Sequence, residues 1–218
     1  FCRGKCTYCN FASGVFGAER MERYVERLCA EISSAKVGSG RAMQRVEGEK
    51  LPREVDTVFL GGGTPSLLDA EQMQRVFGAL RGEFEMAAGA EVTLECAPGQ
   101  MSEATLEEML RQGMSRVSFG VQSFVDAEAR AVGRMHTRAT CLEEIQRMQA
   151  AGVSEVNIDL IVGLPRQTEE SLRHAVEVVE PSAYPAVPVP FYPEIGVVLP
   201  RPGHVYARVR RFRPAGHA

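Results

Sequence analysis

Short apolar runs alternate four times with amphipathic helical patterns in this chain, and no other feature limits its fold so strongly. The runs are rich in β-branched residues and indicate strands, whereas the segments after them carry apolar residues three or four positions apart, as helices do. The predicted strands are 55–60, 91–95, 116–122 and 156–162. Strands that alternate with helices form parallel units joined by right-handed crossovers, so the sequence predicts an α/β fold.

Helices are predicted on both sides of the first strand and after every later one. They cover 18–34 and 69–84, and further helices begin at Ser102, Thr137 and Thr168. Four strands, with one more expected ahead of the first residue, predict a partial TIM-type (β/α)6 barrel that is truncated at both ends. An open, doubly wound parallel sheet is the alternative.

The composition of the chain changes after residue 180. Eight of the 12 prolines lie in 181–218, where Glu194 is the one acidic residue. Proline at this density disfavours helices and central strands. We therefore predict a core domain over 1–180 and an irregular, proline-rich tail over 181–218. The polar segment 35–54 is predicted to be a surface insertion.

Charge and hydropathy exclude two broad classes of protein. Lys and Arg number 25 against 28 Asp and Glu, a net charge of −3, which disfavours a protein that mainly binds nucleic-acid phosphates. No apolar stretch reaches the roughly 18 residues that a transmembrane helix needs. The chain begins at Phe1, inside a cysteine motif, so we expect the natural N-terminus and any targeting peptide to be missing. The expected location is the cytoplasm, or the mitochondrion or plastid of a eukaryote.

Three of the six cysteines, Cys2, Cys6 and Cys9, form a C-x3-C-x2-C pattern. A secreted disulfide domain would be shorter and more evenly supplied with cysteine, so the pattern indicates a metal site in a reducing compartment. Structural zinc and [4Fe–4S] clusters usually take four protein ligands. Three thiolates leave one iron of a cubane open to a small chelating molecule, which is how S-adenosylmethionine (SAM) serves as a radical source. Zinc completed by a distant ligand is the alternative.

The remaining cysteines and one acidic residue have simpler interpretations. Cys29 and Cys141 fall on apolar helical faces and are expected to be structural. Cys96 ends a strand and could approach the site, but a structural thiol is the simpler expectation. Asp159 lies inside the apolar strand 156–162, where a charge is costly unless it is paired or bound to a ligand. This makes Asp159 the most informative single residue.

The cysteine motif, with Tyr8 before its third cysteine, resembles that of the radical SAM superfamily. Four further motifs occur in a compatible order, at 61–66 (GGGTPS), 120–124 (GVQSF), 133–136 (GRMH) and 159–165 (DLIVGLP). Together they resemble the HemW family of heme chaperones, which is similar to HemN, the oxygen-independent coproporphyrinogen III oxidase. The resemblance covers residues 1 to about 180. Asn10-Phe11 after the third cysteine and Ser66 favour HemW over HemN.

The resemblance implies a set of residues for each cofactor. Cys2, Cys6 and Cys9 would hold a [4Fe–4S] cluster. The residues expected to bind SAM are Tyr8, Gly62, Gly63, Thr64, Glu95, Gln122, Arg134 and Asp159. The family reads Ala-Asn-Pro after this glutamate, whereas this chain has Cys96-Ala97-Pro98. No catalytic residue is assigned. His136 could be a heme ligand, but a loop histidine is more often a hydrogen-bonding scaffold.

Three functions follow from these patterns. The first is a HemW-like protein that binds a cluster, SAM and heme, and delivers heme to an acceptor protein. The second is a HemN-like enzyme, in which a reductant protein feeds the cluster and a 5′-deoxyadenosyl radical drives the oxidative decarboxylation of a porphyrinogen. The third is a zinc-stabilised α/β module without redox chemistry.

Overall fold

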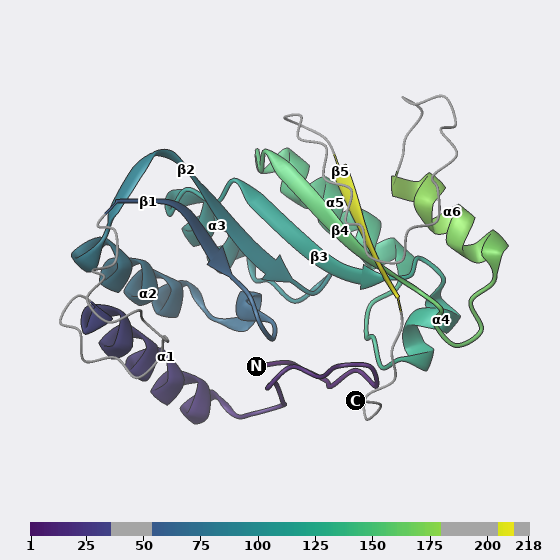
Figure 1. Ribbon diagram of the computed structural model, residues 1–218, viewed down its shortest axis with the longest axis horizontal. Coiled ribbons are helices and arrows are strands. Elements are labelled where there is room, and N and C mark those ends of the chain that lie inside the picture. The colour runs from purple at the N-terminus through teal and green to yellow at the C-terminus, as the bar shows by residue number, and fades with distance from the viewer. Residues whose placement is uncertain (36–53, 180–204, 212–218) are drawn as a thin grey trace, which may run out of the picture.

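The structure is a computed structural model, which describes residues 1–35, 54–179 and 205–211. The helices are α1 (Ala18–Ser33), α2 (Ala70–Glu83), α3 (Glu103–Arg111), α4 (Asp126–Ala131), α5 (Arg138–Ala150) and α6 (Glu169–Val179), with a short 3-10 helix η2 (Pro65–Leu67). The strands are β1 (Glu54–Leu60), β2 (Glu85–Cys96), β3 (Arg116–Gln122), β4 (Glu155–Val162) and β5 (Val205–Arg211). Their arrangement is shown in Figure 1.

The five strands form one sheet in the order β1-β2-β3-β4-β5, and every adjacent pair is parallel. A doubly wound sheet reverses its strand order at a switch point, whereas a barrel adds each new strand beside the previous one. The sequential order is therefore of the barrel type, and the α/β barrel-type fold predicted from the sequence is confirmed. Helices connect the consecutive strands through β4.

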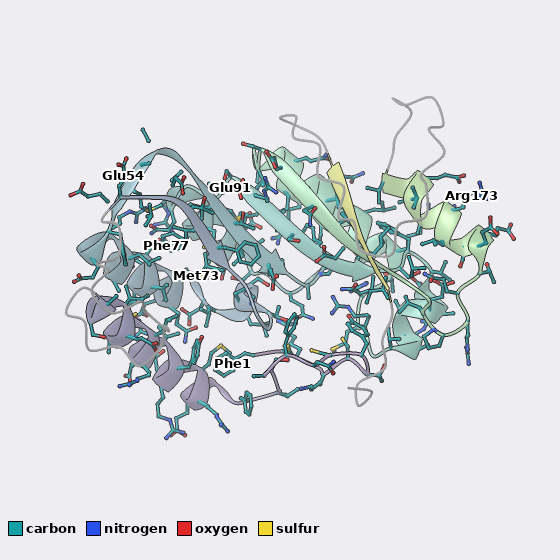
Figure 2. All side chains as sticks on the ribbon, viewed as in Figure 1. Phe1, Glu54, Met73, Phe77, Glu91 and Arg173 are labelled. Carbon is teal, nitrogen blue, oxygen red and sulfur yellow. The ribbon has the colours of Figure 1, made fainter. Side chains whose placement is uncertain are left out.

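Alternate residues of the central strands face opposite sides of the sheet. The apolar set packs against the helices and is almost completely buried, with Leu94, Phe119 and Ile158 each 0% exposed. Met73 and Phe77 of α2 belong to the same core and are labelled in Figure 2. The opposite face is polar, as expected for the interior of a barrel that holds a ligand.

On the polar face, a triad of charged side chains connects three neighbouring strands. Arg116 of β3 lies 2.8 Å from a carboxylate oxygen of Glu91 on β2 and 2.6 Å from one of Glu155 on β4. A second contact joins Asn157 to Ser118, whose Oγ accepts a hydrogen bond of 2.8 Å. Because these side chains connect neighbouring strands, they fix the register on which the site at the strand ends depends.

The helix starts follow the predicted caps. The hydroxyl of Ser102 accepts a hydrogen bond from the Thr105 backbone amide at the start of α3. The hydroxyl of Thr137 accepts one from the Thr140 backbone amide at the start of α5. Gly152 follows α5 with a φ of +84°, a left-handed conformation that suits glycine at a helix C-terminus.

Several elements differ from the sequence-based expectation. Strand β2 starts six residues earlier than the predicted 91–95, because 85 and 86 also pair with β1 before a register shift. The helices η2 and α4 were not predicted, since three and six residues are too few for a periodic pattern. Strand β5 contradicts the prediction of an irregular tail for its seven residues, which contain no proline. The rest of that tail and nearly all of the predicted insertion lie outside the described residues.

Candidate functional site

The cysteine-bearing segment 1–17 runs past the carboxyl ends of the strands without forming a helix or strand (Figure 1). Backbone hydrogen bonds attach it to two of the strand-end loops. The Thr64 amide donates to the Phe1 carbonyl at 2.7 Å, and the Thr7 amide donates to the Val132 carbonyl at 3.2 Å. The segment is therefore held beside the edge where barrel active sites lie.

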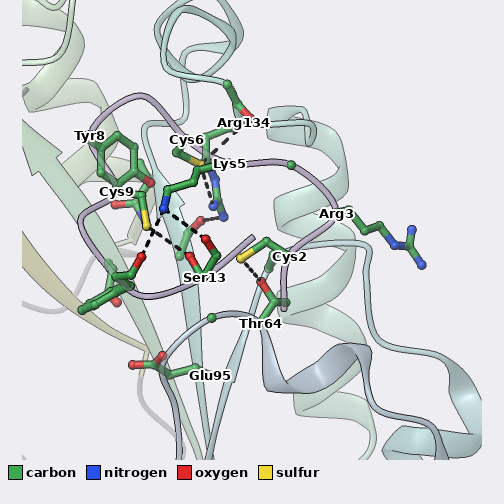
Figure 3. Close-up of a pocket in the computed structure, with 18 of the residues that line it drawn as sticks. Cys2, Arg3, Lys5, Cys6, Tyr8, Cys9, Ser13, Thr64, Glu95 and Arg134 are labelled. Carbon is green, nitrogen blue, oxygen red and sulfur yellow. Dashed lines mark hydrogen bonds between the residues drawn. The ribbon is translucent and has the colours of Figure 1, made fainter. Parts of the chain in front are cut away.

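Lys5 closes the segment into a loop. Its ammonium donates to the carbonyl oxygens of Phe11 at 3.2 Å and Ser13 at 3.0 Å. The Cys2 amide also donates to the Gly14 carbonyl at 2.9 Å, which joins the two ends of the loop. Figure 3 shows the three cysteine sulfurs on the inner side of this loop.

Each cysteine sulfur has a polar neighbour that holds its position. Thr64 Oγ1 donates to Cys2 Sγ, an Arg134 nitrogen donates to Cys6 Sγ, and Cys9 Sγ contacts Ser13 Oγ, all at 3.6 Å. The three thiols are free and partly exposed. They can therefore reach a ligand in the cavity without rearrangement of the core.

Three thiols on one loop can each serve a different iron of a cluster. Within the described ranges, no three cysteine, histidine or acidic side chains converge on one ion position. One zinc would draw its ligands to about 2.3 Å from a common centre. In an iron–sulfur cubane each thiolate binds a different iron, so the sulfurs stand further apart. Three unpaired thiols that line one cavity from one loop thus fit a [4Fe–4S] cluster.

The glycine motif after β1 brings backbone close to both the cysteine loop and β2. Gly62 has a φ of +112°, and its amide donates to a carboxylate oxygen of Glu95 at 2.9 Å. A Cβ on Gly63 would lie 2.6 Å from the Phe1 carbonyl oxygen, so no side chain fits there. The glycines therefore permit contacts that any larger residue would block.

The far wall of the cavity comes from the ends of β3 and β4. Gln122 is buried and has a φ of +71°, a strained conformation for a residue with a side chain. Arg134 donates to the Gly120 carbonyl as well as to Cys6, and its Nε is buried without a hydrogen-bond partner among the described residues. A carboxylate oxygen of Asp159 accepts a hydrogen bond of 3.3 Å from the side-chain amide of Asn157.

All eleven residues singled out from the sequence line a single cavity of about 320 Å³. Tyr8 lies at this cavity, where burial raises its pKa well above the usual range, so its phenol stays protonated. The sequence did not single out Lys5, Gln100, Ser118 or Met135, which also line the cavity. Lys5 and Met135 lie inside quoted motifs but are not residue types that the pattern marks as ligands, and Gln100 and Ser118 belong to no motif.

His136 and Cys96 have structural contacts. His136 is 7% exposed, and its Nε2 lies 3.0 Å from the Val121 carbonyl, to which it can only donate. Burial lowers the pKa of His136 to about 4. The Cys96 thiol donates to the Ala97 carbonyl at 3.4 Å, and burial raises its pKa to about 12, which keeps it a neutral thiol. These contacts agree with a scaffold role for both side chains.

Comparison with known proteins places these features in a family. A model of the radical SAM superfamily matches residues 1–179. The heme chaperone HemW of Lactococcus lactis is 33% identical over 81% of this chain and 43% of its own length, and that of Escherichia coli is 33% identical over 83% and 46%. The solved structure of E. coli coproporphyrinogen III oxidase, HemN, a radical SAM enzyme, superposes with a TM-score of 0.69 and 29% identity over 82% of this chain and 39% of that one.

The chain thus spans less than half the length of these relatives. None of its helices, as far as the structure describes them, is both long and apolar enough to cross a membrane.

Proposed function

This chain belongs to the radical SAM superfamily, and we propose that it binds a [4Fe–4S] cluster through Cys2, Cys6 and Cys9 and SAM in the adjoining cavity. The observation that carries this proposal is the convergence of the predicted residues on one cavity. They come from the cysteine loop, the ends of β1 to β4 and the loop after α4.

The charges around the cavity match the groups of an aminoacyl nucleoside. Arg134 lines the cavity, and the forked donors of its guanidinium suit the carboxylate of an amino acid. Glu95 and Asp159 line the same space, and their carboxylates can accept from an ammonium group or from ribose hydroxyls. When bound, the reduced cluster and SAM together would supply one-electron chemistry.

The relatives extend the proposal to heme and porphyrin metabolism. HemW proteins of two bacteria match most of this chain, so we assign it the role of a HemW-like heme chaperone that receives electrons from a reductant protein and passes heme to an acceptor protein. A compartment such as the cytoplasm or the mitochondrion is compatible with this role, since a mouse relative is named as mitochondrial.

A HemN-like oxidase is the second candidate, because the solved HemN structure shares the fold at a TM-score of 0.69. In that case the substrate would be a porphyrinogen rather than heme. The arrangement of the cavity suits both functions, since both need the same cluster and cosubstrate.

Anaerobic reconstitution with iron and sulfide tests the cofactor assignment. We expect a brown protein with about four irons per chain and the absorption of a [4Fe–4S] cluster. A colourless protein that holds one zinc would refute both candidates and support the zinc-stabilised module.

Two further assays separate the candidates. Reconstituted protein is incubated with dithionite, SAM and coproporphyrinogen III, and the products are analysed for decarboxylation. In parallel, heme-loaded protein is mixed with an apo-acceptor. Heme transfer without decarboxylation supports the chaperone, whereas a decarboxylated product supports the oxidase.

A further inference from the structure

The three cysteine sulfurs are attached to the rest of the chain in different ways. Those of Cys2 and Cys6 each accept a hydrogen bond of 3.6 Å from a side chain outside segment 1–17. Within the described residues, the hydrogen bonds of Cys9 stay inside the segment. Its amide donates to the Cys6 carbonyl at 3.1 Å, and its sulfur contacts Ser13 Oγ at 3.6 Å. The position of the third sulfur therefore depends on hydrogen bonds within the loop itself.

Lys5 holds the part of the loop on which Cys9 depends. Its ammonium donates to the carbonyl oxygens of Phe11 at 3.2 Å and Ser13 at 3.0 Å. The Ser13 hydroxyl is in turn the group that contacts the Cys9 sulfur. Figure 3 shows the Lys5 side chain crossing the loop to reach these carbonyls, whereas Arg3 points away from the loop. Lys5 thus fixes the residue that the third sulfur contacts.

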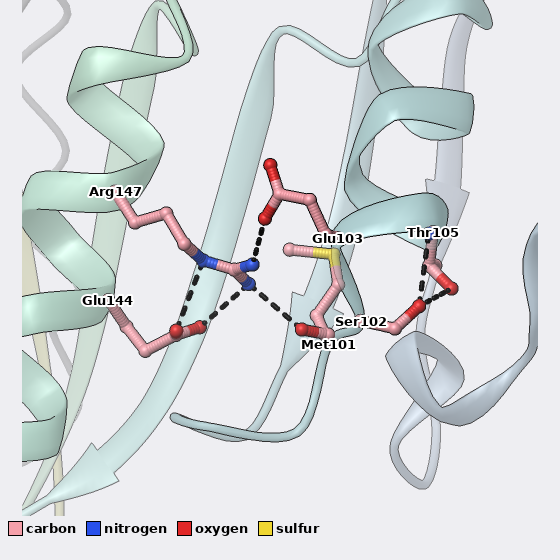
Figure 4. A network of polar contacts seen from close by, with 6 residues as sticks. All are labelled: Met101, Ser102, Glu103, Thr105, Glu144 and Arg147. Carbon is pink, nitrogen blue, oxygen red and sulfur yellow. Dashed lines mark hydrogen bonds and ion pairs between the residues drawn. The ribbon is translucent and has the colours of Figure 1, made fainter.

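The charge of Lys5 has no counterion within the described ranges. For comparison, Arg147 of α5 also donates to a main-chain carbonyl, that of Met101, at 2.9 Å, but two carboxylates pair with it (Figure 4). Lys5 bonds only to carbonyls there, and segment 1–17 contains no acidic residue. Lys5 also lines the cavity with the three thiols. An uncompensated positive charge beside three thiolates favours a negatively charged occupant.

We propose that Lys5 is a positioning residue for the cluster, which holds the Cys9 part of the loop and, through its positive charge, favours the reduced state of the cluster. This assignment rests on the proposed function of the cavity. Hydrogen bonds from an ammonium are stronger than neutral ones, so two of them can hold a segment that forms no helix or strand. Reduction adds negative charge to the cluster, so a nearby cation raises the reduction potential.

The loop contact is tested first in the apo-protein, where no cofactor is needed. Chymotrypsin cleaves after Phe11, which is 58% exposed, when the loop opens, and the rate follows the population of the open form. Lys5→Met removes the ammonium, Lys5→Arg keeps a charged donor, and Arg3→Met removes an exposed cation of the same loop. We expect fragment 1–11 to appear about 10-fold faster in Lys5→Met, the effect of one charged hydrogen bond.

The other two variants should be cleaved as slowly as the unsubstituted chain. Equal cleavage rates in all four proteins would overturn the loop contact. The melting temperature of apo Lys5→Met should be unchanged, because segment 1–17 contributes no residue to the main buried core. A lower melting temperature would make Lys5 a structural residue of the whole fold and would overturn its assignment as a positioning residue.

The reconstituted proteins then test the role of Lys5 toward the cluster. Lys5→Met should lose iron to a chelator about 10-fold faster than the unsubstituted chain, for the same reason as above. Its reduction potential, measured by a redox titration followed by electron paramagnetic resonance, should shift to lower values. Lys5→Arg should retain both properties, because it keeps the charge and the donor.

Two results would contradict the proposal in different ways. An unchanged rate of iron loss or an unchanged potential in Lys5→Met would overturn the assignment of Lys5 while the cluster assignment stands. An unsubstituted chain that takes up no cluster would overturn the proposed function, and the role of Lys5 toward the cluster with it, even where chymotrypsin detects the loop contact.

Discussion

A guanidinium nitrogen of Arg134 lies 3.6 Å from the sulfur of Cys6, although 128 positions separate the two residues in the sequence. The same guanidinium donates to the Gly120 carbonyl at the end of β3. Arg134 thus connects the cysteine loop to the sheet. The contact joins the two halves of the proposed site, the cluster ligands and the nucleoside cavity.

Arg134→Met should weaken both the binding of the cluster and the binding of the nucleoside. Loss of a partly buried, charged donor typically costs about 1.5 to 3 kcal/mol of the interaction it supports. We expect the reconstituted variant to lose iron faster to a chelator and to bind S-adenosylhomocysteine at least tenfold more weakly. Arg130→Met, at an exposed position on α4, is the matched control and should behave as the unsubstituted chain. Equal iron retention and affinity in the two variants would contradict the role of Arg134.

Cys6→Ala should abolish cluster binding while the helical content stays nearly unchanged. The Cys6 side chain is on a loop at the cavity rather than in the core, so its removal leaves the packing of the helices intact. Iron analysis and circular dichroism test the two halves of this prediction. Cys29→Ala, on α1, is the control and should keep its iron. A full complement of iron in the Cys6 variant would count against the assignment of the ligands.

Protonation of His136 in the unfolded chain should lower the free energy of unfolding in mild acid. Its pKa is about 4 in the folded chain against 6.5 in the unfolded chain, because burial disfavours the charged form. The unfolded state therefore binds the proton first, and stability falls as the pH drops from about 6.5 to 4, by up to about 3 kcal/mol. Denaturant unfolding at several pH values measures this loss.

His136→Gln provides the comparison for that titration. Glutamine can donate to the Val121 carbonyl but does not titrate. The difference in unfolding free energy between the two proteins should shift steadily in favour of the variant between pH 6.5 and 4. A difference that is constant across this range would refute the low pKa of His136.

Arg116→Met should destabilise the sheet more than the loss of an exposed ion pair. Arg116 is 21% exposed and holds two carboxylates, so its removal leaves Glu91 and Glu155 without their shared partner. We expect a loss of about 1 to 3 kcal/mol. In Arg173→Met, where the pair with Glu169 is exposed, the loss should stay below about 0.5 kcal/mol. Similar unfolding midpoints for the two variants would contradict the structural role of the triad.

Gly63→Ala should displace the cysteine loop. The added Cβ would lie within 2.7 Å of the Phe1 backbone, which the Thr64 amide also binds. We expect lower iron content after reconstitution and a lower melting temperature. Gly78→Ala in α2 meets nothing within 4 Å and should instead raise stability by about 0.5 to 1 kcal/mol. Normal iron content in the Gly63 variant would show that the loop can move without loss of the site.

Much of the fold could be predicted because its signals are local. The apolar strands and the caps at Ser102 and Thr137 depend on residues close together in the chain, and the structure agrees with them. The early part of β2 could not be predicted, because it depends on pairing with β1, which is separate in the sequence. Strand β5 could not be predicted either. Prolines surround it in the sequence, and its pairing with β4 is also non-local.

The cavity shows the same division between local and non-local information. Spacing alone identified the three cysteines, the glycine motif and the isolated charge of Asp159, because each is a recognisable pattern of residue types within a few positions. Only the folded chain brings Arg134 onto Cys6 and makes His136 a buried donor. Such contacts join segments that the parallel sheet places at one edge. They depend on strand order and register, which no short stretch of sequence contains.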